Sequence, residues 1–386
     1  QLITYYLGSV MDLQYLLADS TSIRKIISSC VTNAGASPEA EAARLFASID
    51  VQGANYRSDS SIVLQDTETE SRYNGFDEDD ALAAISIISS VLFDGGGGAW
   101  QAWLDLSYTY ADGIFRASNS DPRDTLQHCS ETMRFIIKTA IWFDVLAAIT
   151  TQQAPRFLHR IRQLYSPETS GGIFDPSLPP SEELSMMSVM GCENHIVWAM
   201  AEVSALAVWK QDQIDRGCLS IPTLVARATE FDKTYLNQTA MMTLRFGASD
   251  TEVARELSSN IFRAATRVYL RAIVSGDYYP HVPELIDAIE ETMSFVRQTL
   301  THSQKLHHSV VRSTVFAFFI CGALTDNPRL QNEVYNKLSL EGEDPSTPTV
   351  GNIASIRNLL QQIWNGRSKI SAHTPVPRRN VLRDSN

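Results

Sequence analysis

The side chains that most readily suggest chemistry lie in one short stretch, at Cys192, Glu193 and His195. On a helix, residues three apart share a face, so the thiol of Cys192 and the imidazole of His195 would meet. A thiol beside a base is what a cysteine nucleophile requires. The alternative is that Gly191 ends one segment, Glu193 or Asn194 opens a helix, and Cys192 packs as a small apolar side chain. We favour this alternative.

A second candidate is the acidic run Asp77 to Asp80, which precedes an apolar stretch. Such a run binds magnesium in helical prenyl-chain enzymes, which need a second acidic cluster facing the first across a cavity. We find no second cluster in the sequence. Acidic residues are also stabilising in the first turn of a helix, because they complement its dipole. We therefore interpret the run as a helix start and keep a helical prenyl-chain enzyme as the less favoured alternative.

Two further patterns have structural interpretations that we prefer. The glycines Gly95 to Gly98 lack the Lys and Ser or Thr that complete a phosphate-binding loop, so we expect a tight turn between helices. His302, His307 and His308 are poorly spaced for one helix face, which favours a solvated helix start over a metal site.

Asp144 stands within the apolar stretch "KTAIWFDVLAAIT". A buried carboxylate without a partner is costly, so we expect a basic partner for it, with Arg156 and Arg160 as candidates. The interpretation that we favour is a structural ion pair.

The elements that position these residues are helices. Apolar residues recur at helical spacing, and no period-2 run bounded by turn residues indicates a strand. We predict an all-α fold, a single large irregular multi-helix domain over residues 1–370 with no significant sheet, an acidic loop at about 50–76 and a disordered tail at 371–386. The expected helices cover residues 2–18, 21–33, 39–48, 78–93, 98–117, 124–151, 155–163, 182–188, 193–215, 220–232, 249–275, 281–298, 303–325, 328–339 and 350–366.

Composition and charge disfavour several further classes of function. The net charge of −12 over 386 residues disfavours direct binding to nucleic acid. No apolar run reaches the ~18 residues of a membrane span, so we expect no membrane contact. Five scattered cysteines indicate free thiols and exclude a CxxC-type zinc site. The chain begins at Gln1 without Met, and we interpret it as a piece whose N-terminus is missing.

Six stretches, taken together and in order, resemble the fungal-specific transcription factor domain of zinc-cluster regulators. The most distinctive are "FIIKTAIWFDVLAAITTQQAPRFL" (135–158), "MGCENHIVWAMAEVSALAVWK" (190–210) and "IFRAATRVYLRAIVSGDYYPHVPELIDAIEETMSFV" (261–296). The others are "GGGGAWQAWLDLSYTYADGIF" (95–115), "VVRSTVFAFFICGALTDNPRL" (310–330) and "IASIRNLLQQIW" (353–364). The resemblance runs from about Leu2 to Trp364, and the six-cysteine zinc cluster of such regulators is absent from this sequence.

The resemblance implies a nuclear regulatory region, without enzymatic activity, that senses a small-molecule effector, forms a homodimer or does both, and that contacts transcriptional co-regulators. It implies no cofactor in this chain, with zinc only in a DNA-binding module before Gln1. The alternative that we keep is a ligand-free helical scaffold that docks a partner.

An effector pocket would be mainly apolar. Our candidates for its walls are Met186, Met187 and Met190 on one side, and Phe316, Phe319 and Cys321 on another, although we favour the interpretation that the same residues are plain core. We predict structural roles for Asp144, Gly191, Trp198 and Trp209.

Overall fold

The computed structural model describes residues 17, 23, 25, 26, 76–93, 100–118, 120–167, 181–237, 248–276, 282–342 and 351–369. Over these residues the chain is helical and forms no strand, which confirms the all-α prediction. The elements are α5 (Glu78–Phe93), α6 (Trp100–Ser118), α7 (Pro122–His128), α8 (Glu131–Thr151), α9 (Leu158–Tyr165), α10 (Met187–Met190), α11 (Asn194–Asp215), α12 (Ile221–Phe231), the π-helix η3 (Asp232–Leu236), α13 (Asp250–Ser275), α14 (Pro283–Gln298), the 3-10 helix η5 (Thr299–Thr301), α15 (Gln304–Ser313), α16 (Val315–Leu324), α17 (Pro328–Gly342) and α18 (Gly351–Lys369).

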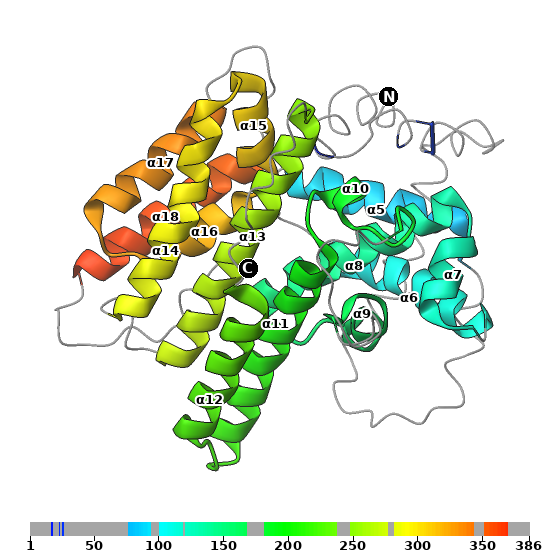
Figure 1. Cartoon of the computed structure of the whole chain (residues 1–386), viewed down its shortest axis with the longest axis horizontal. Coiled ribbons are helices and arrows are strands. Elements are labelled where there is room, and N and C mark those ends of the chain that lie inside the picture. The colour runs from blue at the N-terminus through cyan, green and yellow to red at the C-terminus, as the bar shows by residue number, and fades with distance from the viewer. Residues whose placement is uncertain are drawn as a thin grey trace.

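The longest of these helices, α13, lies at the centre of the fold (Figure 1). It begins with a capping box, in which Ser249 and Glu252 each accept a backbone N–H from the other. From Leu257 to Thr266 every side chain is buried, so neighbours surround the helix on all sides. These neighbours are α11, α12, η3, α14, α15 and α16.

On one side of α13 lie α5 to α11, held around α8 (Figure 1). The side chains of α8 are buried without interruption from Phe135 to Val145, which makes it the interior helix of this half. Trp142 of α8 meets Phe262 of α13 edge-to-face, with ring centroids 5.0 Å apart, and so joins the two helices.

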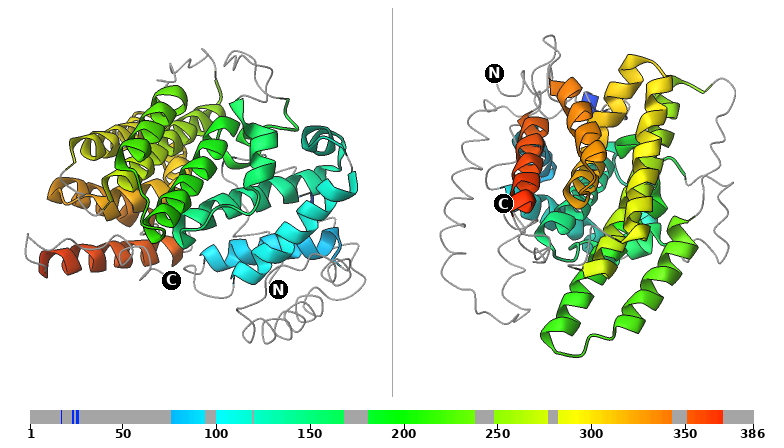
Figure 2. Two further views of the ribbon diagram at one scale, coloured as in Figure 1. Left: turned by 90° about the horizontal axis from the view of Figure 1, so that it is seen from below. Right: turned by 90° about the vertical axis from the view of Figure 1, so that its left-hand side faces the viewer.

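On the other side of α13 lie α14 to α18, with α16 packed against α13, α14, α17 and α18. Figure 2 shows α18 alongside α17 in both views. The close approach of α17 and α18 to α16 depends on Gly322 of α16. A Cβ at this position would lie 3.0 Å from Leu360 of α18 and 3.2 Å from Val334 of α17. Trp364 of α18 then donates its indole N–H to the Gly322 carbonyl at 2.9 Å.

Three predicted helices differ from the structure. The helix expected over 124–151 is two, because Ser130 caps α8 by accepting the Met133 N–H at 3.0 Å. The helix expected over 303–325 is also two, α15 and α16, with a bend of 67° between them at Thr314. The helix expected over 182–188 is replaced by turns followed by the short α10.

Within the described residues, no single helix is long and apolar enough to cross a membrane, while the bent pair α15 and α16 meets the criterion together by length and composition only. Other predictions fall outside the described residues. They are the three N-terminal helices apart from Leu17, Ile23, Lys25 and Ile26, the acidic loop, the glycine run at 95–98 and the tail at 371–386.

Candidate functional site

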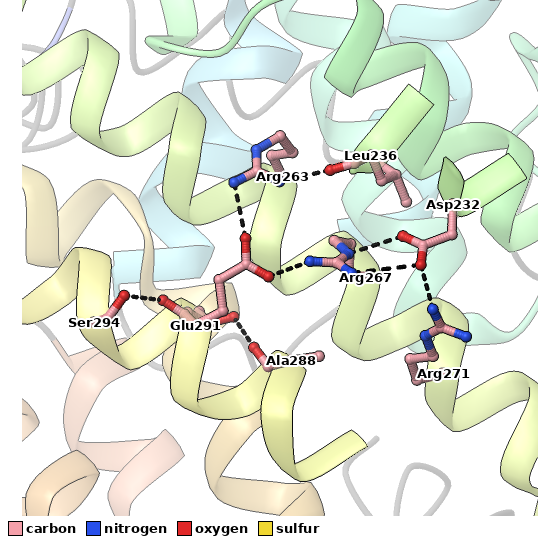
Figure 3. Close-up of polar contacts among 9 residues, drawn as sticks. Asp232, Leu236, Arg263, Arg267, Arg271, Ala288, Glu291 and Ser294 are labelled. Carbon is pink, nitrogen blue, oxygen red and sulfur yellow. Dashed lines mark hydrogen bonds and ion pairs between the residues drawn. The ribbon is translucent and has the colours of Figure 1, made fainter. Parts of the chain in front are cut away.

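The most distinctive polar feature of the described fold is a buried ionic network that joins η3, α13 and α14 (Figure 3). Arg263 donates to Glu291 at 3.0 Å, and Arg267 donates to the second oxygen of the same carboxylate. Arg267 also donates to Asp232 at 2.8 Å, and Arg271 donates to the other oxygen of Asp232. The charges therefore alternate along a line, with an arginine at each end.

Helix geometry places the three arginines in one row. Arg263, Arg267 and Arg271 are four residues apart on α13, a spacing that puts side chains on one helical face. Glu291 reaches Arg263 and Arg267 from α14, which runs beside α13. The row lies among apolar residues, so the arginines would be costly to bury without these carboxylates.

The position of Asp232 depends on a π turn. It begins η3, in which the Asn237 N–H bonds back to the Asp232 carbonyl at 2.7 Å, five residues earlier. π turns are rare and are found frequently at functional sites. Aromatic rings support this turn, since Trp198 of α11 lies 4.7 Å from Tyr235 and 5.4 Å from Phe231 between ring centroids.

Burial makes the network electrostatically strong. The side chains of Arg263 and Asp232 are 4% and 6% exposed. Burial alone would lower the pKa of Arg267, but its bonds to Asp232 and Glu291 outweigh that effect and raise the pKa above its usual value. Arg267 therefore remains charged, and by formal charge three guanidinium groups of this network face two carboxylates.

The stretch from Cys192 to His195 is the start of a buried helix. Burial raises the pKa of the Cys192 thiol well above its usual value, and its sulfur lies 3.8 Å from the Glu193 carbonyl. His195 pairs with the Glu193 carboxylate at 3.1 Å. Because the thiol is protonated at neutral pH, it is not the activated nucleophile that a Cys–His dyad requires. Gly191 ends α10 with a left-handed φ of 63°.

The methionines proposed as a pocket wall lie at α10, which packs against α8. Met186 is fully buried, whereas Met187 and Met190 are half-buried. Asn194 accepts the Met186 N–H at 2.7 Å and donates to the Leu184 carbonyl at 3.0 Å, which ties this segment to the start of α11.

The second proposed wall lies on α16, where Cys321 is buried and Phe316 and Phe319 are half-buried. Burial raises the pKa of the Cys321 thiol to about 12. In Figure 1, α13 stands between α16 and α10, so the structure does not bring the two proposed walls together.

Two tryptophans have defined neighbours. Trp198 is 7% exposed and belongs to the aromatic group beside η3. Trp209 is half-buried at the outer part of α11, where the Arg227 guanidinium carbon lies 4.4 Å from the centre of its ring. This cation–π contact joins α12 to α11.

Asp144 does not form the predicted ion pair with Arg156 or Arg160. Its carboxylate instead accepts the Phe157 N–H at 2.9 Å, and burial raises its pKa. Arg156 pairs with Asp105 and Arg160 with Asp112. Asp144 thus satisfies a backbone donor at the start of α9, a role that no sequence pattern indicated.

The acidic run and the histidines also have local roles. Asp77 accepts the Asp80 N–H at 2.9 Å, and Asp80 accepts the Asp77 N–H at 3.3 Å, which caps α5. His307 is buried against Thr299 at 2.5 Å, and burial lowers its pKa to about 4, whereas His308 is half-buried. Within the described residues, no group of three or more His, Cys, Asp or Glu side chains could hold a metal ion.

Sequence reasoning missed the ionic network and also Lys138, a buried lysine of α8. Its ammonium donates to the carbonyls of Ser185 at 2.8 Å and Glu182 at 3.3 Å, and burial lowers its pKa to about 8. The signal for the network was the row of arginines within the apolar stretch "IFRAATRVYLRAIV". Charges repeated at four-residue spacing on a buried helix indicate that acidic partners lie on neighbouring elements.

The helical fold and the quoted stretches agree with a family model. The model described as "Fungal specific transcription factor domain" matches residues 3–373. This chain belongs to that family. The match covers all of the described helices, including the elements that build the ionic network.

The curated proteins that the chain resembles are named as transcription regulators. The chain is 24% identical over 239 residues to the ustiloxin B cluster transcription factor ustR of Aspergillus flavus, covering 59% of this chain and 37% of that protein. It is 22% identical over 259 residues to the transcriptional regulatory protein pro1 of Neurospora crassa, covering 62% and 34%. It is 24% identical over 303 residues to the trichothecene biosynthesis transcription regulator TRI10 of Fusarium sporotrichioides, covering 76% and 63%. The chain spans about a third of the length of the first two relatives. No solved structure matches it.

Proposed function

We propose that this chain is the regulatory part of a fungal zinc-cluster transcription factor that controls transcription by RNA polymerase II. The observation that carries the proposal is the family match over residues 3–373. The relatives carry names of transcription regulators, of which two name a biosynthetic cluster and one names trichothecene biosynthesis. In this proposal the chain acts in the nucleus, and DNA contact and zinc belong to a separate module.

Within that role, the chain would sense a small-molecule effector, form a homodimer and contact transcriptional co-regulators. The net charge of −12 supports a division of labour in which another module contacts DNA. The fold is consistent with a domain that transmits a conformational change, because the central helix α13 contacts elements of both halves. An effector would change transcription only if the domain has two conformations that bind the effector with different affinities.

A reporter experiment tests the regulatory role. Residues 1–386 are fused to a heterologous DNA-binding domain that has no activation region of its own, and reporter transcript is measured in a fungal host. We expect transcript to differ from that given by the DNA-binding domain alone, and to change with growth conditions if an effector is sensed. Fusion protein that accumulates in the nucleus and leaves the reporter unchanged would contradict the proposal.

Native mass spectrometry of the purified chain separates the finer alternatives. A dimer with a discrete extra mass would support effector sensing together with dimerisation. A dimer without added mass would support a ligand-free scaffold. A monomer would contradict dimerisation through this chain.

A further inference from the structure

The ionic network is incomplete at its exposed end. Along the line of charges, Glu291 is shared by Arg263 and Arg267, and Asp232 is shared by Arg267 and Arg271. Each carboxylate is therefore neutralised from both sides. The arginines at the two ends each have only one carboxylate, which leaves the network with one positive charge in excess.

The two ends differ in their surroundings. At the inner end, Arg263 is 4% exposed and donates a further hydrogen bond to the Leu236 carbonyl at 2.5 Å. Its Nε–H has no acceptor among the described residues. At the outer end, Arg271 is 23% exposed, and Asp232 is its one hydrogen-bond partner in the described part of the chain. The remaining N–H groups of the Arg271 guanidinium are therefore available to a molecule from solvent.

The geometry points to an anion-binding site at Arg271, where a carboxylate or phosphate group of a small molecule would continue the alternation of charges. A guanidinium presents paired N–H donors that match the two oxygens of such a group. Asp232 does not repel the anion strongly, because Arg267 and Arg271 already neutralise it. The chain as a whole carries −12, so the anion would be held by the local excess of positive charge at Arg271 and not by the overall field of the chain.

This inference deepens the proposed effector-sensing function and rests on it for its biological meaning. An anion bound to Arg271 would share that guanidinium with Asp232, which begins the π turn that follows α12. Its occupancy would stabilise the docking of η3 on α13 by completing the ionic network that holds them. The effector class that we propose is a small organic acid or a phosphorylated metabolite.

The site is tested by isothermal titration calorimetry on the purified 386-residue chain at pH 7.5. Inorganic phosphate and succinate serve as separate probes, with ionic strength held constant by sodium chloride. The test variant is Arg271→Gln. The matched control is Arg227→Gln, which removes a guanidinium from α12 that stacks on Trp209 and takes no part in the network.

We expect saturable binding of at least one probe, and which probe binds distinguishes a phosphate from a carboxylate ligand. Loss of the charged donors in Arg271→Gln should weaken binding about tenfold or more, while Arg227→Gln should bind as wild type does. Arg271→Lys keeps the charge without the paired donors and should give intermediate affinity, which covers the case in which the glutamine variant fails to fold.

Two results would overturn the inference. One is that neither probe gives saturable heat beyond an equal addition of chloride. The other is that Arg271→Gln, or Arg271→Lys if the first is unfolded, binds as tightly as wild type. Because the titration uses no reporter, failure of the anion site would leave a positive reporter result standing, and a failed reporter would not alter the titration.

Discussion

Replacing Gly191 by alanine tests how tightly the turn between α10 and α11 packs against Leu17. Gly191 has φ of 63°, and a Cβ built there would lie 3.0 Å from Leu17 Cβ and closer still to Leu17 Cδ1. The left-handed conformation costs a residue with a Cβ about 1–2 kcal/mol. Forcing a methyl group against a packed side chain costs about a further 1–3 kcal/mol. The expected loss in the free energy of unfolding is therefore about 2–5 kcal/mol.

Gly217 offers a matched control for the same substitution. Its φ of 66° is almost equal, but a Cβ there meets nothing within 4 Å. Gly217→Ala should therefore cost only the backbone term of about 1–2 kcal/mol. Urea unfolding of both variants, compared at equal m-values, measures the difference. Equal losses for the two variants would refute the inference that Leu17 packs against Gly191.

Three further changes test the network, a buried lysine and a helix start. Asp232→Asn should destabilise the chain by roughly 3–5 kcal/mol because two arginines lose their shared partner, whereas Glu202→Gln, which breaks a pair with a half-exposed arginine, should cost about 1 kcal/mol or less in urea unfolding. Burial lowers the pKa of Lys138 to about 8, so between that pH and its ordinary value of 10.5 the unfolded chain binds a proton that the folded chain does not. The free energy of unfolding of wild type should consequently increase relative to that of Lys138→Met as pH rises from about 8 to 10. Parallel curves of unfolding free energy against pH for the two proteins would contradict the lowered pKa of Lys138. Ser130→Ala should cost about 1 kcal/mol by removing the acceptor of the Met133 N–H, and thermal unfolding should show a lower Tm.

The sequence predicted the fold class and most helices because apolar periodicity is a local property. It failed at Ser130 and Thr314, where the apolar pattern runs on across a break in the helix. At Ser130 the break depends on one side-chain cap. At Thr314 the hydroxyl bonds back to the Val310 carbonyl at 2.7 Å while the next helix turns away, and nothing in the neighbouring residues marks that direction.

The candidate site was harder to predict because its parts are distant in the sequence. The arginine row on α13 was visible, but its partners come from 35 residues before Arg267 and 24 residues after it. Periodicity does not report such separations. Asp144 shows the same difficulty, because the need for a partner was foreseen while the partner itself, the Phe157 N–H, was not. A buried charge predicts that it must be satisfied, and the tertiary fold decides by what.

The central position of α13 has a consequence for the synthesis of the chain. The apolar face of α11 is complete when the ribosome has passed Asp215, but α13, which packs against it, does not begin until Asp250. During that interval this face lacks the helix that covers it, and exposed apolar surface in a growing chain favours aggregation. Transcripts that end before α13 should therefore yield insoluble products, not a shorter working regulator. A nonsense mutation upstream of Asp250 would then abolish the function of this chain completely.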